Sequence, residues 1–274
     1  MKILKKFLYY FALIFSYQKF YKLSLILRYL SFRISGIDNY ENNNISGETN
    51  FINKLKNIYK NNKLCIFDVG CNKGDYSNLL LNTFPNLKLH CFDPSKINIA
   101  KMKKRFKTKN LFLNQVAVGK ENGKIIIWDY SNNEGSEHAS AYKDSLLTHN
   151  SNRKIKKYTA KKITLKNYIE QNAIEKIDLL KIDVEGMEFD VLKGLGKKIL
   201  KISFIQFEFN LTNAYNKVLF LDFFELLNKN FKLYRLLPNE FLPIQKYNPI
   251  EHEIYAFQNI VAVSKKLKID IQKS

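Results

Sequence analysis

The sequence predicts an α/β fold in which a doubly wound, mostly parallel β-sheet follows an N-terminal helical extension. From about residue 51 onward, short runs of continuous apolar residues alternate with stretches of helical pattern. Strands that are apolar throughout have no side for solvent, so helices must cover both faces of the sheet, as in parallel sheets. The chain has 274 residues, 46% of them hydrophobic, which is enough for one sizeable core and an appendage.

Residues 1–50 are predicted to form a helical extension and a polar linker. The first 35 residues carry seven basic residues and no acid, and their longest uninterrupted apolar run is only Phe7 to Phe15. A bilayer-spanning helix needs about 20 apolar residues, and a signal peptide has small residues near its cleavage site. Neither pattern is present, which leaves a basic, aromatic-rich helix on an anionic membrane surface or a helix packed on the next domain. Asparagine and glycine from Gly36 to Asn50 predict the linker.

Residues 51–274 are predicted to form one domain. Its predicted helices are 51–60, one that starts after Gly74, 95–107, 163–172, 186–197 and 218–229. Its predicted strands are 64–70, 86–92, 111–118, 124–130, 177–184, 203–209, 231–237 and 255–264. In a doubly wound sheet ligands bind beyond the carboxyl ends of the strands, so polar residues at those ends are candidates for a site.

The formal net charge of +20 suggests an anionic partner, such as a membrane surface, a phosphorylated substrate or nucleic acid. The alternative is a compositional bias toward lysine, asparagine and isoleucine that raises the charge with no partner involved. Nucleic-acid binding is not expected, because neither a known module nor aromatic residues interleaved for base stacking are evident. Cys65, Cys71 and Cys91 lack the spacing of a zinc site or a disulfide framework. They indicate a reducing compartment, so we expect a cytoplasmic protein, with residues 1–35 available for peripheral contact with the inner face of the membrane.

The stretch CIFDVGCNKGDYS, residues 65–77, joins a strand to a helix through two glycines. Their spacing, from Gly70 to Gly74, is G-x-x-x-G and not the G-x-G-x-x-G that places a pyrophosphate at a helix N-terminus. Asp68 precedes the glycines and Asp75 follows them. Two acids disfavour a pyrophosphate and suit a cationic ligand, whose amine or hydroxyl Asp68 could bind. An ordinary strand-to-helix turn would use the same glycines.

Two further strand ends carry residues suited to a nucleoside. LKLHCFDP places Asp93 where a carboxylate can bind both hydroxyls of a ribose, or can cap the helix that begins near Ser95. LFLNQVAVGK places Gln115 and Ala117 where an adenine ring could lie against apolar side chains. A ribose acid and an adenine site without a pyrophosphate loop point to S-adenosylmethionine as the cofactor.

These motifs resemble, in order and spacing, those of FkbM-type methyltransferases. The resemblance is carried by DVGCNKGDYS, CFDPS, NQVAVGKENGKI, ITLKNYIEQNAIEKIDLLKIDVEGMEFDVLKGL and FIQFEFN. It covers residues 63–210 well, and KIDLLKIDVEGMEFDVLKG is its most specific part. It implies a class I methyltransferase (Rossmann-like) fold and an S-adenosylmethionine-dependent O-methyltransferase that acts on sugar or polyketide hydroxyls. For this basic chain we expect an anionic acceptor: a glycan or a nucleotide-linked sugar.

Carried over by position, the family's cofactor loop falls on four residues and its ribose acid on one. The loop residues are Asp68, Gly70, Asn72 and Gly74, and the ribose acid is Asp93, where the family more often has glutamate. Either acid offers a bidentate carboxylate, so the resemblance implies the same role for Asp93.

Methyl transfer to a hydroxyl needs an aligned acceptor and a base that takes its proton. Asp183 ends the strand IDLLKID, and Glu208 ends SFIQFEF. These strands are neighbours in a class I sheet, so the two carboxylates should lie near each other and face the cofactor's methyl end. One could be the base, its pKa raised by its neighbour, or the pair could hold Mg²⁺, which takes oxygen ligands. Glu185 and Glu188 could simply supply negative charge to the first turn of a helix.

His138 is another candidate base, because neutral imidazole suits proton removal near neutral pH. It lies in GSEHASAY, residues 135–142, the part of this chain that corresponds to a serine-rich segment of the family, and this polar loop could close over the acceptor. A surface histidine is the alternative. Acceptor contacts are expected from residues 132–152 and from the carboxyl-terminal third.

Two other classes of protein remain as alternatives. A nicotinamide-dependent oxidoreductase of Rossmann type would need the tighter glycine fingerprint and a loop suited to pyrophosphate. A membrane-surface or nucleic-acid-binding protein would explain the basic charge but not the acids at successive strand ends. The sequence therefore favours a methyltransferase.

Overall fold

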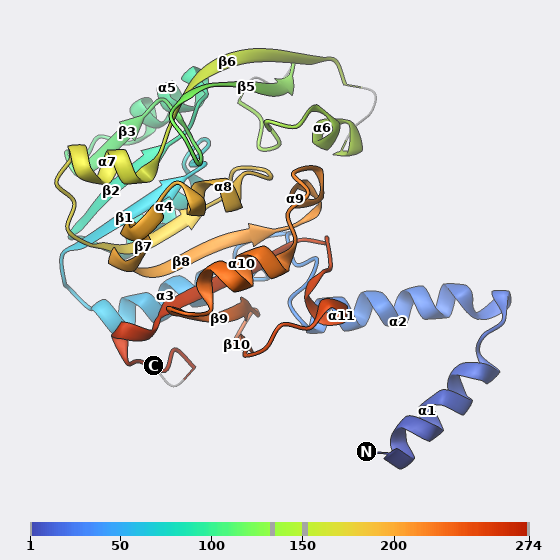
Figure 1. The fold of residues 1–274 in the computed structure, drawn as a ribbon. Coiled ribbons are helices and arrows are strands. Elements are labelled where there is room, and N and C mark those ends of the chain that lie inside the picture. The colour runs from blue at the N-terminus through green and yellow to red at the C-terminus, as the bar shows by residue number, and fades with distance from the viewer. Residues whose placement is uncertain (1, 132–134, 150–152, 273–274) are drawn as a thin grey trace.

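The computed structural model describes residues 2–131, 135–149 and 153–272. Within these residues the main sheet has eight strands in the order β10-β9-β11-β8-β7-β1-β2-β3 (Figure 1). The five strands from β8 to β3 are parallel, whereas β11 is antiparallel to both its neighbours, β8 and β9. The bounds are β1 Leu64–Val69, β2 Leu87–Phe92, β3 Leu111–Asn114, β7 Ile177–Ile182, β8 Ile202–Phe209, β9 Phe231–Leu236, β10 Phe241–Ile244 and β11 Gln258–Ser264.

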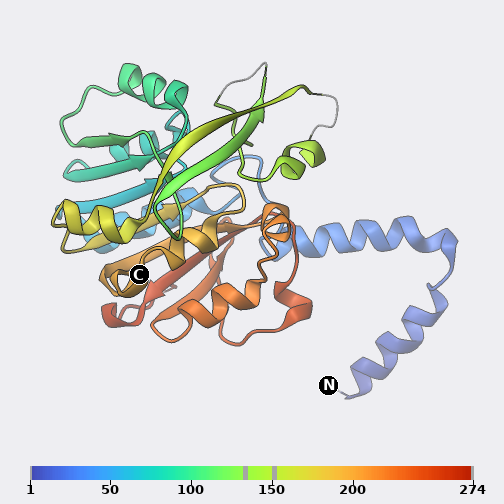
Figure 2. The ribbon, with the colours of Figure 1, turned by 45° about the horizontal axis from the view of Figure 1, so that its top comes forward.

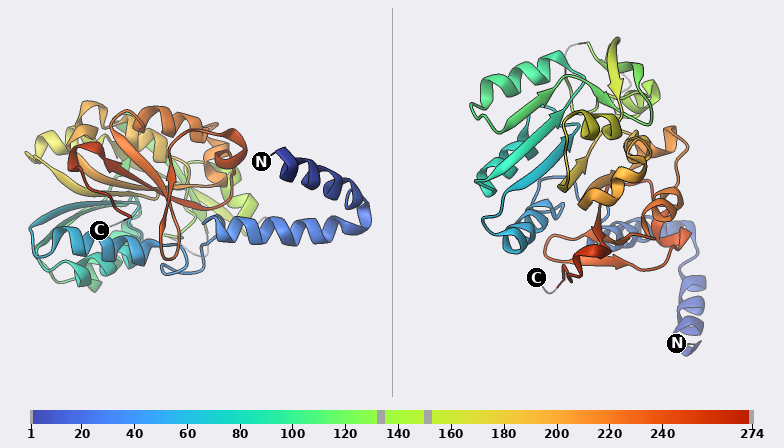
Figure 3. Two further views of the ribbon diagram at one scale, coloured as in Figure 1. Left: turned by 90° about the horizontal axis from the view of Figure 1, so that it is seen from below. Right: turned by 60° about the vertical axis from the view of Figure 1, so that its left-hand side comes forward.

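Helices cover both faces of this sheet, as the apolar strands predict (Figure 3). One face carries α3 (Glu48–Tyr59), α4 (Asp75–Thr83) and α5 (Lys96–Arg105), and the other carries α7 (Leu165–Gln171), α8 (Glu188–Lys193) and α10 (Phe220–Leu227). Strand β8 shows why its sequence is apolar throughout. Phe204 packs against Phe51 of α3, whereas Phe207 stacks on Phe223 of α10. Alternate residues of a strand point to opposite faces, so both cores are filled. The doubly wound, mostly parallel fold is confirmed.

A second sheet of three strands lies over the carboxyl ends of the main strands (Figure 2). Its order is β4-β6-β5, with β4 at Ala117–Val118, β5 at Gly123–Tyr130 and β6 at Ile155–Ile163. The predicted strand 111–118 is therefore divided between β3 and β4, which belong to different sheets. The sequence did not indicate β6, because IKKYTAKKI contains four lysines and, among these described residues, Ala160 alone is buried.

The remaining elements of the domain are short. The predicted helix 186–197 is divided into α8 and the 3-10 helix η2 (Gly196–Lys201). β10 pairs with β9 and was not predicted, because it has only four residues and contains Pro243. The others are α6 (Lys143–His149), α9 (Leu211–Tyr215), α11 (Pro249–His252) and η3 (Lys265–Leu267).

The N-terminal segment forms two helices that project from the body of the molecule (Figure 1, Figure 3). They are α1 (Lys2–Ile14) and α2 (Tyr21–Ile34), joined through the 3-10 helix η1 (Gln18–Phe20). The sequence predicted helix here, without the break between the two. Within the described ranges, none of the helices combines the length and the apolar character needed to cross a bilayer.

The polar residues after α2, predicted as a linker, pack against the main sheet. Ile37 forms a bridge with Gln258 at the start of β11 and is only 2% exposed. The Asp38 N–H donates to the carbonyl of Phe257 at 2.7 Å. α3 then begins at Glu48, before the predicted residue 51. The segment that joins the projecting helices to the domain is therefore held against the main sheet just after α2.

Candidate functional site

A cavity lies between the carboxyl edge of the main sheet and the small sheet. Its empty space is about 620 Å³, which includes open solvent at its mouth. The ends of β1, β2 and β7 form one wall, and β4, β5 and residues between 136 and 141 form the opposite one. The cavity is therefore at the carboxyl ends of parallel strands, where the sequence predicted a ligand.

Gly70 brings the loop after β1 against the end of β7. Its φ is +86°, and a Cβ atom built there would lie 1.6 Å from the carbonyl oxygen of Asp183. Its N–H donates to the carbonyl of Phe92 at 2.8 Å, so this turn also contacts the end of β2. Only glycine fits a left-handed backbone at so close an approach. Gly70 and Asn72 line the cavity, whereas Gly74 starts α4 outside its wall.

Asp68 lies behind this loop and not in the cavity wall. Its side chain is 1% exposed and accepts a hydrogen bond of 2.6 Å from the Ser77 hydroxyl of α4. Burial raises the pKa of Asp68 to about 6. Asp68 therefore links the loop to α4 and does not line the cavity, where the sequence predicted that it would contact a ligand.

Asp93 follows β2 and lines the cavity. Its Oδ2 accepts a hydrogen bond from the Asn72 N–H at 3.0 Å and its Oδ1 one from the Ser95 N–H at 2.8 Å. The Asn98 amide nitrogen lies 3.3 and 3.4 Å from the two oxygens. Burial raises the pKa of Asp93 to about 6, although these hydrogen bonds oppose the shift. Ser95 itself is the N-cap of α5, so Asp93 is not the helix cap that the sequence left as an alternative.

Of the two residues predicted beside an adenine ring, Ala117 lines the cavity and Gln115 does not. Gln115 is exposed where the chain crosses from β3 to β4. Val116, Val118 and Ile127 join Ala117 in an apolar wall. A flat base can pack against such a wall, so the apolar slot is formed by the strand-to-strand crossing and not by Gln115.

Lys181 of β7 is buried among three carboxylates beside the cavity. Its Nζ atom lies 3.3 Å from Glu48 Oε1, 3.4 Å from Asp183 Oδ2 and 3.6 Å from Glu208 Oε1. Burial alone would lower the pKa of Lys181, but the three negative charges outweigh it and raise that pKa well above its usual range. Burial and the charge of Asp183 together raise the pKa of Glu208. Asp183 and Glu208 are thus close, as expected, and the ammonium that joins them was not predicted.

The residues present do not fit the Mg²⁺ site considered from the sequence. Asp183 and Glu208 share the Lys181 ammonium, whose positive charge would repel a metal cation at the same place. Within the described part of the chain, no group of three or more histidine, cysteine, aspartate or glutamate side chains could hold a metal ion.

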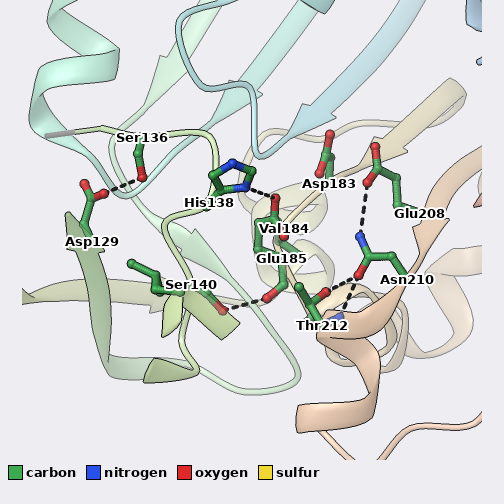
Figure 4. Close-up of polar contacts among 12 residues, drawn as sticks. Asp129, Ser136, His138, Ser140, Asp183, Val184, Glu185, Glu208, Asn210 and Thr212 are labelled. Carbon is green, nitrogen blue, oxygen red and sulfur yellow. Dashed lines mark hydrogen bonds and ion pairs between the residues drawn. The ribbon is translucent and has the colours of Figure 1, made fainter. Parts of the chain in front are cut away.

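The turn after β7 presents Glu185 to the cavity, a residue that the sequence assigned only to a helix turn. Its backbone φ is +53°, and burial raises the pKa of its carboxyl well above the usual range. The Ser140 hydroxyl donates to its carbonyl at 2.8 Å, and His138 Nδ1 lies 3.9 Å from its Oε1 (Figure 4). The buried Glu188 accepts hydrogen bonds from the Val184 N–H and Gly186 N–H, and so fixes the turn.

The loop that carries His138 is fixed over the cavity by Asp129 of β5. Asp129 accepts hydrogen bonds from the Gly135 N–H at 2.7 Å and from the Ser136 hydroxyl (Figure 4). The His138 side chain remains 43% exposed, with Glu185 on its inner side. Of the segment predicted to contact the acceptor, residues 132–134 and 150–152 lie outside the described residues.

Strand order and site together define a class of protein. Five parallel strands, an antiparallel strand inserted between β8 and β9, and a cavity at the carboxyl edge with an acid after β2 are the features of a class I S-adenosylmethionine-dependent methyltransferase. Residues 68–236 match the family model described as "Methyltransferase FkbM domain". The chain therefore belongs to the FkbM methyltransferase family.

Solved methyltransferase structures are similar to this chain at low sequence identity. The plantazolicin methyltransferase BpumL, in complex with a triazolic analogue and SAH, is 13% identical, with 86% of this chain and 90% of that chain covered and a TM-score of 0.43. The precorrin-6y C5,15-methyltransferase from Geobacter metallireducens is 10% identical, with coverages of 79% and 88% and a TM-score of 0.39. No curated protein matches the chain.

Proposed function

We propose that this methyltransferase transfers the methyl group of S-adenosylmethionine to a hydroxyl of a sugar, a sugar nucleotide or a surface glycan. The observation that carries the proposal is the position of Asp183, which lines the cavity and also pairs with the buried Lys181. A carboxylate held in this way can orient an acceptor hydroxyl and take its proton as the oxygen attacks.

The cavity residues fit S-adenosylmethionine. Asp93 offers its carboxylate to ribose hydroxyls, which would replace the long contacts from the Asn98 amide. The apolar wall around Ala117 suits adenine, and the carboxylate of Asp183, further along the same cavity, suits a cationic ligand. When bound, the cofactor supplies an electrophilic methyl group.

Asp183 is the candidate base on grounds of access. Its side chain is 35% exposed, whereas that of Glu208 is 13% exposed and lies outside the cavity wall. Glu208 instead pairs with the buried Lys181, whose Nζ lies 3.6 Å from its Oε1. We therefore assign Glu208 to positioning Lys181, and Lys181 to holding Asp183 by charge. His138, beside Glu185, is the second candidate base.

The positive charge near the cavity suggests the class of acceptor. Lys143 and Lys157 each place an ammonium over the Trp128 ring, 5.6 and 5.5 Å from its centre. Trp128 follows Ile127 of the cavity wall on β5, and consecutive strand residues point to opposite faces, so the Trp128 ring and both ammonium groups are close to the cavity but not in its wall. Together with the net charge of +20, these cations near the cavity favour an acceptor that carries phosphate or carboxylate, as nucleotide-linked sugars and acidic glycans do.

Labelled methyl transfer tests the proposal. The full-length protein is incubated with S-adenosylmethionine bearing a deuterated methyl group and a panel of sugar nucleotides and glycans, and fragmentation mass spectrometry locates the label. The expected result is a label on a sugar hydroxyl that is absent with Asp183→Asn. Transfer to amines or carbons, or to non-sugar hydroxyls alone, would contradict the acceptor assignment.

A further inference from the structure

The N-terminal arm, residues 2–34, exposes an unusual amount of apolar surface. Sixteen of the 25 exposed large apolar side chains in the described residues belong to the arm, between Leu4 and Ile34. In α1, at 100° per residue, Phe7, Phe11 and Ile14 lie on one side of the helix, and Lys5 and Lys6 lie on the opposite side. An exposed helix with one apolar face and one basic face suits burial of the apolar face against another molecule or a membrane surface.

The chemistry of the arm distinguishes lipid from a protein core. Residues 1–35 carry seven lysine and arginine residues and no acid. Five of its sixteen exposed apolar side chains are tyrosines, which have an apolar ring and a polar tip and are enriched where hydrocarbon meets water. A second copy of the arm would bring seven like charges against seven, whereas an anionic lipid surface neutralises them.

The arm leaves the body at the edge of the sheet that carries the site. Ile37 pairs with Gln258, and β11 places Gln258 opposite Phe209 and Asn259 opposite Glu208. Arg235 of β9 donates to the carbonyl of Ser35 at 3.3 Å, which fixes the root of α2. A surface that binds the arm therefore also lies near the carboxyl edge of the main sheet.

We propose that the N-terminal arm binds the surface of an anionic lipid membrane, with its tyrosines, phenylalanines and leucines in the interfacial region and its basic residues on lipid phosphates. α1 and α2 have 13 and 14 residues, so each extends about 20 Å and suits a position along the surface. This binding site is independent of the methyl-transfer proposal and would hold whatever the acceptor is.

Vesicle sedimentation of the full chain tests the charge requirement. The vesicles contain phosphatidylcholine alone or phosphatidylcholine with about 30% phosphatidylglycerol. The arm variant combines Lys19→Gln, Lys22→Gln and Arg28→Gln, three exposed positions. We expect binding to the anionic vesicles only, and an affinity on the order of 100-fold lower for the arm variant. High salt should release the wild-type protein.

A matched variant on α5 controls for charge alone. Lys101→Gln, Lys103→Gln and Lys104→Gln remove the same charge from exposed positions of the folded domain, and vesicle affinity should change less than threefold. In a third variant, Phe7→Ser with Phe11→Ser should weaken binding at least tenfold without loss of charge.

Three results would overturn the proposal. In the first, the full-length chain stays in the supernatant with anionic vesicles. In the second, the arm variant and the α5 variant lose vesicle binding equally. In the third, light scattering shows that the wild type is a dimer and that the arm variants are monomers. The melting temperatures of all variants should match the wild type, because the substituted side chains are outside the core.

Discussion

The Nζ atom of Lys181 of β7 lies 3.4 Å from Oδ2 of Asp183, the residue that directly follows this strand. The lysine side chain is 3% exposed and the aspartate side chain 35%. A buried cation thus holds a carboxylate that a ligand in the cavity can reach. Because Glu48 and Glu208 also pair with Lys181, the position of Asp183 depends on packing from three separate elements of the fold.

Removal of the ammonium should destabilise the protein strongly. Lys181→Met leaves three acids without their cation, and breaking a buried ion pair typically costs about 3–5 kcal/mol of the free energy of unfolding. Lys73→Met is the control, since Lys73 pairs with Glu137 at 2.7 Å and the two side chains are 49% and 65% exposed, and such surface pairs contribute less than about 1 kcal/mol. Urea denaturation at neutral pH measures both. Equal losses would mean that the Lys181 cluster has no special role in stability.

Asp68 should make stability fall as pH rises. Burial raises its pKa from 3.8 to about 6, so the folded protein binds this proton more tightly than the unfolded chain does. The stabilisation is fully present below pH 3.8 and is lost as pH rises through about 6, and a shift of about 2 units corresponds to about 3 kcal/mol. Unfolding measured between pH 4 and 8 should be less pH-dependent in Asp68→Asn. An unchanged pH profile would contradict this.

Gly70→Ala should be far more damaging than the same change at Gly196. Both glycines have positive φ, but a Cβ at Gly70 would meet the Asp183 carbonyl, whereas one at Gly196 meets nothing within 4 Å. We expect Gly196→Ala to cost about 1–2 kcal/mol through backbone strain alone and Gly70→Ala to cost at least about 3 kcal/mol. Thermal denaturation compares them. Similar melting temperatures would show that the loop can move away from β7.

Much of the fold could be predicted because its signals are local. Continuous apolar runs locate the strands, and parallel topology brings Asp93 and Asp183 to one edge. Lys181 gave a partial signal, as a charge within the apolar run IDLLKID. Its partner Glu48 comes from α3, and only tertiary packing brings the two together. The strand β6 was not predicted for a similar reason. Its lysine-rich sequence gives no strand signal, and its pairing with β5 holds it in place.

Asp183→Asn should separate catalysis from cofactor binding. The amide cannot take the acceptor's proton, so kcat should fall by about 10²–10⁴-fold, while affinity for S-adenosylhomocysteine changes less than threefold. Glu208→Gln should cost less activity, because Glu208 lies outside the cavity wall and acts on Asp183 only through Lys181. Glu225→Gln, at an exposed position of α10, is the control. A larger loss with Glu208→Gln than with Asp183→Asn would reassign the base.

Calorimetric titration of S-adenosylhomocysteine into the wild type and Asp93→Asn tests the central claim most directly. Asp93 lines the cavity at the end of β2, and loss of hydrogen bonds to a charged group typically weakens binding by about 10–100-fold. The account predicts saturable one-site binding to the wild type and to Glu225→Gln, and binding weakened at least tenfold in Asp93→Asn with the fold intact. Absence of binding to the wild type, or equal affinity in Asp93→Asn, would contradict it.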